Sequence, residues 1–152
     1  MSIFQINKQQ IIPAPLDTVW DFISAPKNLK EITPPSMGFD IVSKDLPEKM
    51  YPGMIIMYKV KPFPGMKVTW VTEITQVAEK KFFIDEQRSG PYAMWHHQHI
   101  LEPAENGVLM KDIITYKPPF WFLGNIANYL IIAKKLEGIF EFREKKLKER
   151  FF

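Results

Sequence analysis

Residues 92–116 read YAMWHHQHILEPAENGVLMKDIITY, and this stretch decides the fold. Apolar and polar residues alternate through 92–101 and again through 107–116, with the turn-forming run EPAENG between the two segments. Alternation with a period of two is typical of a strand that buries one face, and Gly, Pro and Asn are typical of a turn. The stretch therefore predicts two strands joined by a short connection, which makes them antiparallel neighbours.

The same pattern continues toward the N-terminus, where further strands are expected at 3–12, 39–43, 54–61, 67–77 and 81–88. Turn signals such as Pro62-Phe-Pro-Gly65 separate these segments. Between the first two strands, Asp17 and Thr18 open a short helix that Pro26 ends, and residues 27–32 can form one more helical turn. The middle of the chain is thus expected to be one antiparallel sheet.

A long helix is expected at the C-terminus, because no proline follows Lys117-Pro-Pro119. Apolar residues recur there at steps of three, four and seven, which is the spacing of one helix face. These positions are Leu123, Ile126, Leu130, Ala133, Leu136, Phe140, Leu147 and Phe151. An antiparallel sheet needs one face covered, so the sequence predicts an α+β fold in which a curved sheet of about seven strands wraps around this helix.

Length and composition limit the class of protein. A chain of 152 residues with 46% hydrophobic and 14% aromatic residues predicts one globular domain over 1–152 and excludes intrinsic disorder. The absence of cysteine excludes disulfides and thiolate chemistry, and it fits a reducing compartment. The N-terminus has no apolar stretch typical of a secretory signal, so a cytoplasmic location is expected.

The basic residues do not form the pattern of a nucleic-acid binder. The excess of Lys and Arg over Asp and Glu lies within 134–150, where glutamates recur at the spacing of helical ion pairs. A solvated helix face explains this segment, so no nucleic-acid partner is expected. The most apolar stretch, 120–133, contains two asparagines and is shorter than the ~20 residues of a membrane span. The sequence leaves the oligomeric state open.

Together, the order of elements and several motifs resemble the SRPBCC (START-like) superfamily. The motifs are Trp70, Asp85-x-Gln87-x-x-Gly90-Pro91, Trp95-x-His97-x-His99, Asp112-x-Ile114-x-Tyr116 and Ile139-Phe-Glu-Phe-Arg143. Within that superfamily the chain is similar to a bacterial ligand-binding branch labelled cell-division-inhibitor-like or polyketide-cyclase-like. The resemblance covers nearly the whole chain and implies a helix-grip fold with a deep apolar cavity. It does not identify the ligand, because members of the superfamily bind lipids, sterols, polyketides or hormones, and some are enzymes.

A cavity between sheet and helix is expected to bind a small hydrophobic ligand, such as a lipid or a polyketide-like molecule. Candidate apolar wall residues are Met57, Trp70, Trp95, Leu123, Ile126 and Leu130. Candidate residues for the polar end are Arg88, His97, His99, Asp112 and Tyr116. Asp112 is expected opposite or diagonal to His97 on the neighbouring strand.

Three interpretations of the polar residues stay open at this point. They can form a structural network in which Asp112 orients a histidine, or they can bind the polar group of a ligand. In a cofactor-independent cyclase or dehydratase, His97 would act as a general base oriented by Asp112. A structural or interaction protein with a filled cavity is a further alternative, because the same apolar residues would line either an open or a filled space.

No metal and no cofactor are expected from the sequence. His97-Gln-His99 resembles the start of a cupin metal motif, but Glu102 follows at too short a spacing and no later histidine completes the set. Phosphate-binding glycine loops and nucleophile-elbow motifs are absent. The apolar loop 61–66 is expected either to pack against the helix or to form an entrance that makes transient contact with a membrane.

Overall fold

Seven antiparallel strands form one sheet in the computed structural model, which describes residues 3–119 and 125–152, with only the backbone described for 125–129. The strands are β1 (Phe4–Ile12), β2 (Asp40–Ile41), β3 (Met54–Phe63), β4 (Met66–Ala78), β5 (Phe82–Ser89), β6 (Met94–Ala104) and β7 (Gly107–Lys117). The helices are α1 (Leu16–Ile23), the 3₁₀ turns η1 (Pro26–Lys30) and η2 (Pro35–Met37), and α2 (Asn125–Phe151). This α+β helix-grip architecture confirms the predicted fold class.

The strand order in the sheet is β1-β7-β6-β5-β4-β3-β2. Strands β2 to β7 follow one another as a meander, as the short connections predicted. The first strand instead crosses to the far edge and pairs with the last, so that Phe4 lies opposite Tyr116. This closing pair was not part of the prediction, because β1 carries no local signal for a partner so distant in the sequence.

The connection between β6 and β7 is tighter than the alternation suggested. Both strands extend into the expected loop, and Ala104 pairs directly with Gly107. Gly107 adopts a φ of +138°, and a Cβ atom there would lie 2.1 Å from the carbonyl oxygen of Ile12. Glycine is required at this position because the first strand passes against the turn.

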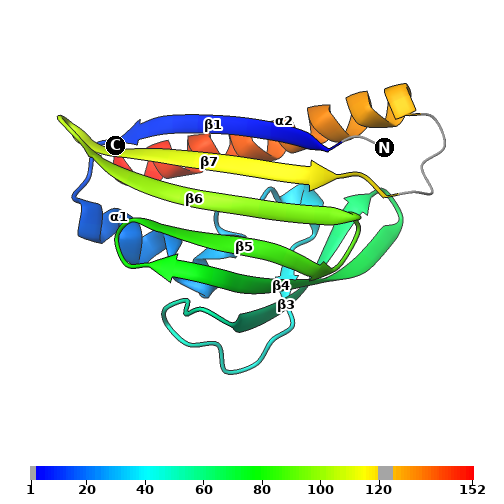
Figure 1. The fold of residues 1–152 in the computed structure, drawn as a ribbon, viewed down its shortest axis with the longest axis horizontal. Coiled ribbons are helices and arrows are strands. Elements are labelled where there is room, and N and C mark those ends of the chain that lie inside the picture. The colour runs from blue at the N-terminus through cyan, green and yellow to red at the C-terminus, as the bar shows by residue number, and fades with distance from the viewer. Residues whose placement is uncertain (1–2, 120–124) are drawn as a thin grey trace.

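Helix α2 lies along the concave face of the sheet, with its C-terminal end beside α1 (Figure 1). Phe22 of α1 and Phe151 of α2 are in edge-to-face contact, with ring centroids 5.7 Å apart. Arg150 Nη1 donates to Glu31 Oε1 at 2.9 Å, just after η1. In the middle of α2, Lys8 of β1 forms an ion pair with Glu137. These contacts fix the helix across the sheet and join it to the two short N-terminal helices.

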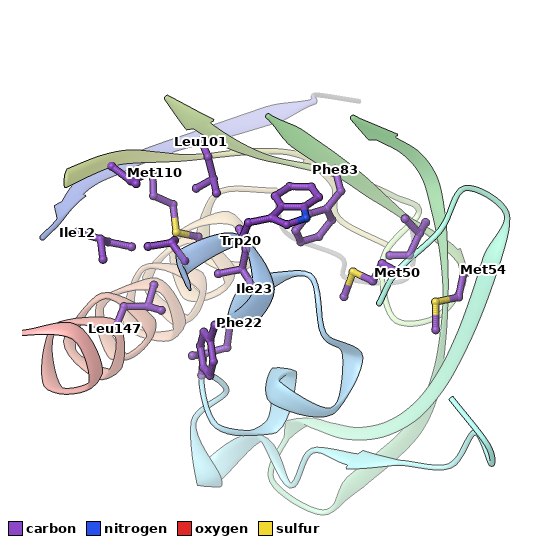
Figure 2. Close-up of a cluster of buried hydrophobic side chains, with 14 of the residues drawn as sticks. Ile12, Trp20, Phe22, Ile23, Met50, Met54, Phe83, Leu101, Met110 and Leu147 are labelled. Carbon is purple, nitrogen blue, oxygen red and sulfur yellow. The ribbon is translucent and has the colours of Figure 1, made fainter. Parts of the chain in front are cut away.

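A fully buried cluster fills the end of the molecule where α1 meets the C-terminal half of α2 (Figure 2). Trp20 of α1 reaches into the concave face and contacts Phe83 of β5 edge-to-face at 6.1 Å. Ile12, Val19 and Leu147 around it are completely buried. We call the residues Ile12, Val19, Trp20, Met110 and Leu147 of this cluster the closed core.

Among the described residues, no helix is long and apolar enough to cross a membrane.

Candidate functional site

A cavity opens between the sheet and α2, next to the closed core. Counted out to its open mouth, its volume is about 890 Å³, of which about 140 Å³ can be reached by the centre of a water-sized sphere. On that second measure a space of about 10–15 Å³ already admits one water molecule, so the cavity is large enough for several waters or part of a ligand. The described side chains therefore leave this part of the interior open.

The walls of the cavity are mostly apolar. Strands β3 and β4 contribute one side, and α2 contributes the opposite side. The inward residues of the two strands alternate as the strand period requires. The principal wall residues are Ile56, Val60, Trp70, Trp95, Leu136 and Ile139.

Four aromatic rings support one wall by packing against one another. Trp70 has its ring centroid 5.9 Å from Tyr58, 5.5 Å from Tyr92 and 5.3 Å from Trp95. Tyr58 shares a 2.9 Å hydrogen bond between its hydroxyl and that of Thr72. Burial raises the pKa of Tyr58 and of Tyr92, so both phenols stay neutral. Stacked, tilted and edge-to-face contacts of this kind stabilise aromatic pairs beyond their area burial, so the rings support one another.

The turn after β5 holds Tyr92 in that wall. The Gln87 side chain donates to the carbonyl oxygen of Tyr92 at 2.7 Å and accepts from its backbone N–H at 3.1 Å. A Cβ atom on Gly90 would lie 2.6 Å from Gln87 Oε1. Glycine at this position therefore gives the glutamine room to bind both backbone groups.

Five buried or nearly buried polar side chains lie together at the inner end of the cavity. Strand β6 supplies His97 and His99, β5 supplies Asp85, β7 supplies Asp112, and α2 supplies Arg143. The sheet register places Asp85 directly opposite His97, and Asp112 directly opposite His99. We call these five residues the polar cluster.

Each histidine of the polar cluster bonds to a carboxylate. His97 Nε2 lies 2.8 Å from Asp112 Oδ1, and His99 Nε2 lies 2.6 Å from Asp85 Oδ2. Carboxylates accept, so in neutral rings both Nε2 atoms carry the proton. Arg143 Nη2 then donates to His99 Nδ1 at 3.1 Å and lies 3.7 Å from Asp112 Oδ1.

Burial, hydrogen bonds and neighbouring charges together determine the protonation states of the polar cluster. Burial and the neighbouring His99 lower the pKa of His97 to about 4, with only partial compensation from Asp112, so His97 is neutral at pH 7. Burial alone would raise the pKa of Asp112, but the Arg143 charge and the hydrogen bond from His97 hold it well below its usual value. For Asp85, the hydrogen bond from His99 and nearby positive charge likewise outweigh burial and lower the pKa. Both carboxylates are therefore ionised.

Several of the predicted site residues do come together here. Trp70, Trp95, His97 and His99 all line the cavity. The predicted common face of Trp95, His97 and His99 is confirmed by their burial between half-buried neighbours. Asp112 lies diagonal to His97, one of the two predicted placements, and contacts the cavity through the histidines.

Tyr116 is buried behind this wall. It contacts Tyr92 and Trp95, with ring centroids 6.0 and 6.4 Å away, but does not line the cavity itself.

Arg88 and Met57 do not lie where the sequence analysis placed them. Arg88 is exposed on the outer face of β5 and forms an ion pair with Glu73. It is an odd number of residues from Asp85, and strand alternation therefore turns it away from the interior. Met57 is 41% exposed on the outer face of β3, while Ile56 and Tyr58 on either side line the cavity.

On α2, the inward face also differs from the predicted one. Leu130 is 59% exposed, because the face toward the sheet runs through Ile132, Leu136 and Phe140. Leu123 lies outside the described residues, and so does the side chain of Ile126.

The sequence analysis missed Asp85 and Arg143 as site residues, although both stand in the motifs quoted for the family resemblance. Asp85 shares its strand parity with the buried Phe83, a signal that was available. Arg143 follows Ile139 by four residues and Leu136 by seven, which places it on the inward face of the helix. Arg143 reaches His99 because of where α2 crosses the strands. The spacing of apolar residues in the sequence does not predict that crossing position.

Next to the main cavity, the β3–β4 turn faces α2. Phe63 packs beneath Lys135, whose Nζ is 4.9 Å from the ring centroid. Burial lowers the pKa of Lys135. A second, smaller cavity lies here and shares Trp70, Tyr92 and Ile139 with the main one. The apolar loop thus packs against the helix, as one of its two interpretations predicted.

The fold and the cavity define the class of protein: a START-like, helix-grip domain. The family described as "Polyketide cyclase / dehydrase and lipid transport" matches residues 12–131. The chain belongs to this family, which confirms the predicted SRPBCC relationship.

Solved structures show the same fold at low sequence identity. A START superfamily protein from Mycobacterium smegmatis is similar with a TM-score of 0.71 and 13% identity, over 97% of this chain and 96% of that chain. The protein TTHA0849 from Thermus thermophilus has a TM-score of 0.69 and 18% identity, over 97% of each chain. Ara h 8.0201 has a TM-score of 0.61 and 15% identity, over 97% of this chain and 99% of that chain. A comparison with curated proteins finds no match.

Proposed function

We propose that this protein binds a small hydrophobic ligand in the cavity between the sheet and α2, for transport or for sensing in the cytoplasm. The observation that carries the proposal is the open cavity itself, walled by apolar and aromatic side chains and ended by the polar cluster. Burial of ligand apolar surface would supply the driving force, at about 25 cal/mol per Å² before ordering costs. The family description, which names lipid transport, supports this reading.

The polar atoms of the wall favour a ligand that carries a hydrogen-bond acceptor. Trp70 Nε1 and Arg143 Nε are buried and have no hydrogen-bond partner among the described residues. Both side chains line the cavity. A buried donor without a partner is costly, so an oxygen atom of the ligand near either group would be stabilising. A lipid carboxyl or a polyketide-like carbonyl has this chemistry.

Native mass spectrometry of the purified protein, followed by solvent extraction, tests the proposal. We expect a reproducible adduct, or saturable uptake of a fluorescent fatty acid when the protein is isolated empty. Ile139→Trp adds bulk at a residue that lines both cavities, so it should weaken uptake at least tenfold.

Ile131→Trp is the matched control, since Ile131 lies on the same helix but is 55% exposed. This variant should leave uptake unchanged. Equal uptake by both variants, or no uptake by the natural sequence, would contradict binding in this cavity.

A cofactor-independent cyclase or dehydratase is the second candidate, favoured by the contact of His97 with both the cavity and Asp112. Asp112 would orient the ring, and the free Nδ1 would take a proton from the ligand. A base with a pKa of about 4 is weak at neutral pH, which is why ligand binding is the first proposal. Turnover of an aromatic polyketide that His97→Gln abolishes, with uptake intact, would establish the enzyme instead.

A further inference from the structure

Each of the two histidines of the polar cluster presents one ring nitrogen to Asp112 and the other to Asp85. Each turns one ring nitrogen toward Asp112 Oδ1: His97 Nε2 at 2.8 Å and His99 Nδ1 at 3.3 Å. Each turns its other nitrogen toward Asp85 Oδ2: His97 Nδ1 at 3.6 Å and His99 Nε2 at 2.6 Å. Asp112 thus faces one nitrogen of each ring, His97 Nε2 and His99 Nδ1, which we call the outer nitrogens. Asp85 faces the other two, His97 Nδ1 and His99 Nε2, which we call the inner nitrogens and which lie at the cavity.

The inner arrangement contains an unfavourable pair of acceptors. With its proton on Nε2, His97 presents a lone pair from Nδ1 to the carboxylate of Asp85, and no hydrogen atom lies between them. The cluster also holds two carboxylates against the single guanidinium of Arg143. A cation at the centre of the inner nitrogens and Asp85 would remove both the lone-pair repulsion and the excess negative charge.

We propose that Asp85, His97 and His99 form a binding site for one divalent transition metal ion, of the Zn²⁺ or Fe²⁺ class. Their ligand atoms all lie within 4.8 Å of one another. Two imidazoles and one carboxylate are the donor set that such metals prefer, in catalytic zinc sites as well as in non-haem iron sites. All three residues line the cavity, so the remaining coordination positions face the ligand space.

The surrounding residues supply the support that metal-bound histidines usually have. The outer nitrogen of such a histidine donates to a carboxylate, which fixes the ring and the tautomer. Asp112 would accept from both outer nitrogens, once the His99 proton moves from Nε2 to Nδ1. Arg143 would then leave His99 Nδ1 and pair with Asp112, which is already 3.7 Å from its Nη2.

The site needs a small local adjustment to bind metal. The 2.6 Å separation of His99 Nε2 and Asp85 Oδ2 has to open to about 3.3 Å, since each ligand atom lies about 2.0–2.2 Å from a tetrahedral zinc ion. No metal was expected from the sequence, because no third ligand follows the His-x-His pair at a suitable spacing. The structure instead supplies Asp85 from the preceding strand, directly opposite His97.

Titration of the untagged, chelator-treated chain with Co²⁺ tests the site. We expect one Co²⁺ per chain, with visible absorption bands that Zn²⁺ abolishes by displacement. Asp85→Asn keeps the shape of the side chain but removes its charge, and should weaken binding by at least about tenfold. The control is His96→Gln, because His96 lies on the outer face beside Glu86.

The outcomes separate clearly. Binding that survives His96→Gln and weakens in Asp85→Asn supports the buried site. Binding that is lost in His96→Gln, or the absence of one-to-one binding by the natural sequence, overturns the proposal.

A second measurement needs no variant and remains decisive if Asp85→Asn does not fold. Long-range ¹H–¹⁵N spectra of the histidine rings report which nitrogen a metal occupies. With Zn²⁺ we expect the changes at His97 Nδ1 and His99 Nε2, with His96 unaffected. Changes confined to His96, or none at all, would overturn the proposal. Loss of ligand uptake would not mimic these signals, so the metal site and the proposed ligand binding fail independently.

Discussion

The two ends of the molecule use the same sheet and the same helix, yet one is filled and the other is open. In the closed core, α1 places Trp20 into the concave face, and Leu147 of α2 belongs to the same cluster with no exposed surface (Figure 2). Toward the other end, the cavity lies between β3, β4 and α2, with Leu29 of η1 and Met37 of η2 at its edge instead of a side chain that fills it. Apolar side chains dominate both regions, so apolar character alone does not decide whether a core is filled.

The comparison shows how a fold can keep space inside. At the open end, rings pack on rings within the wall, as Trp70 does with Tyr58, Tyr92 and Trp95, so these side chains find packing partners on their own side of the cavity. At the closed end, side chains from several elements meet in the centre. The polar cluster stands between the two, where charge and hydrogen bonding stop the apolar packing from continuing.

The largest expected effect comes from two leucines of α2. Leu147→Ala in the closed core should lower the free energy of unfolding by about 4 kcal/mol, because close-packed neighbours cannot fill the new void. Leu136→Ala should cost about 2 kcal/mol, since Leu136 is also buried but borders the existing cavity. Urea denaturation of both variants measures the difference. Equal losses would mean that the cavity end is as tightly packed as the closed core.

Two arginines make the next comparison. Arg143→Met should cost about 3 kcal/mol or more, because it leaves buried Asp85 and Asp112 without their cation. Arg88→Met should have a much smaller effect, since its ion pair with Glu73 is exposed and solvent screens it. Thermal or urea unfolding at neutral pH checks both values. A small loss of stability in the Arg143→Met variant would show that the polar cluster does not depend on this charge.

A smaller loss is expected at the turn that supports the aromatic wall. Gly90→Ala brings a Cβ atom to 2.6 Å from Gln87 Oε1 and should displace the amide from Tyr92. The loss of two hydrogen bonds predicts a cost of about 1–2 kcal/mol. A change in tryptophan fluorescence should accompany it, because Tyr92 contacts both Trp70 and Trp95. Unchanged fluorescence would mean that Tyr92 keeps its position without the two hydrogen bonds from Gln87.

The smallest effect should be a gain. Gly138 lies on the exposed side of α2, and a Cβ atom there would meet nothing within 4 Å. Gly138→Ala should therefore stabilise the protein by about 0.5–1 kcal/mol, through helix propensity alone. Denaturant titration measures the gain, and ligand uptake should stay unchanged. A loss of stability would indicate that the helix depends on the flexibility of this glycine.

Local patterns predicted most of the fold, because each strand and helix carries its own period and its own turn residues. The strand parity of Trp95, His97 and His99 was readable for the same reason. The choice between Arg88 and Asp85 was also within reach, since parity alone separates them.

Other features depend on how distant elements meet, which no local pattern records. The pairing of β1 with β7 joins residues far apart in the sequence. The contact between Arg143 and His99 depends on the position of α2 over β6. On α2 itself, a long run of apolar residues at mixed spacings allows more than one inward face, which is why Leu130 was misplaced.

The pairing of the first strand with the last has a consequence for how the chain matures. Gln5 binds the side chain of Thr115, 110 positions later, so β1 cannot find its partner on the ribosome until β7 has emerged. Strands β2 to β6 can meanwhile pair in order as adjacent hairpins. Such long-range closure is slow and leaves a strand edge exposed to other chains. The last step of folding should thus be the docking of β1 and α2 onto the sheet. The ligand cavity forms only at that step.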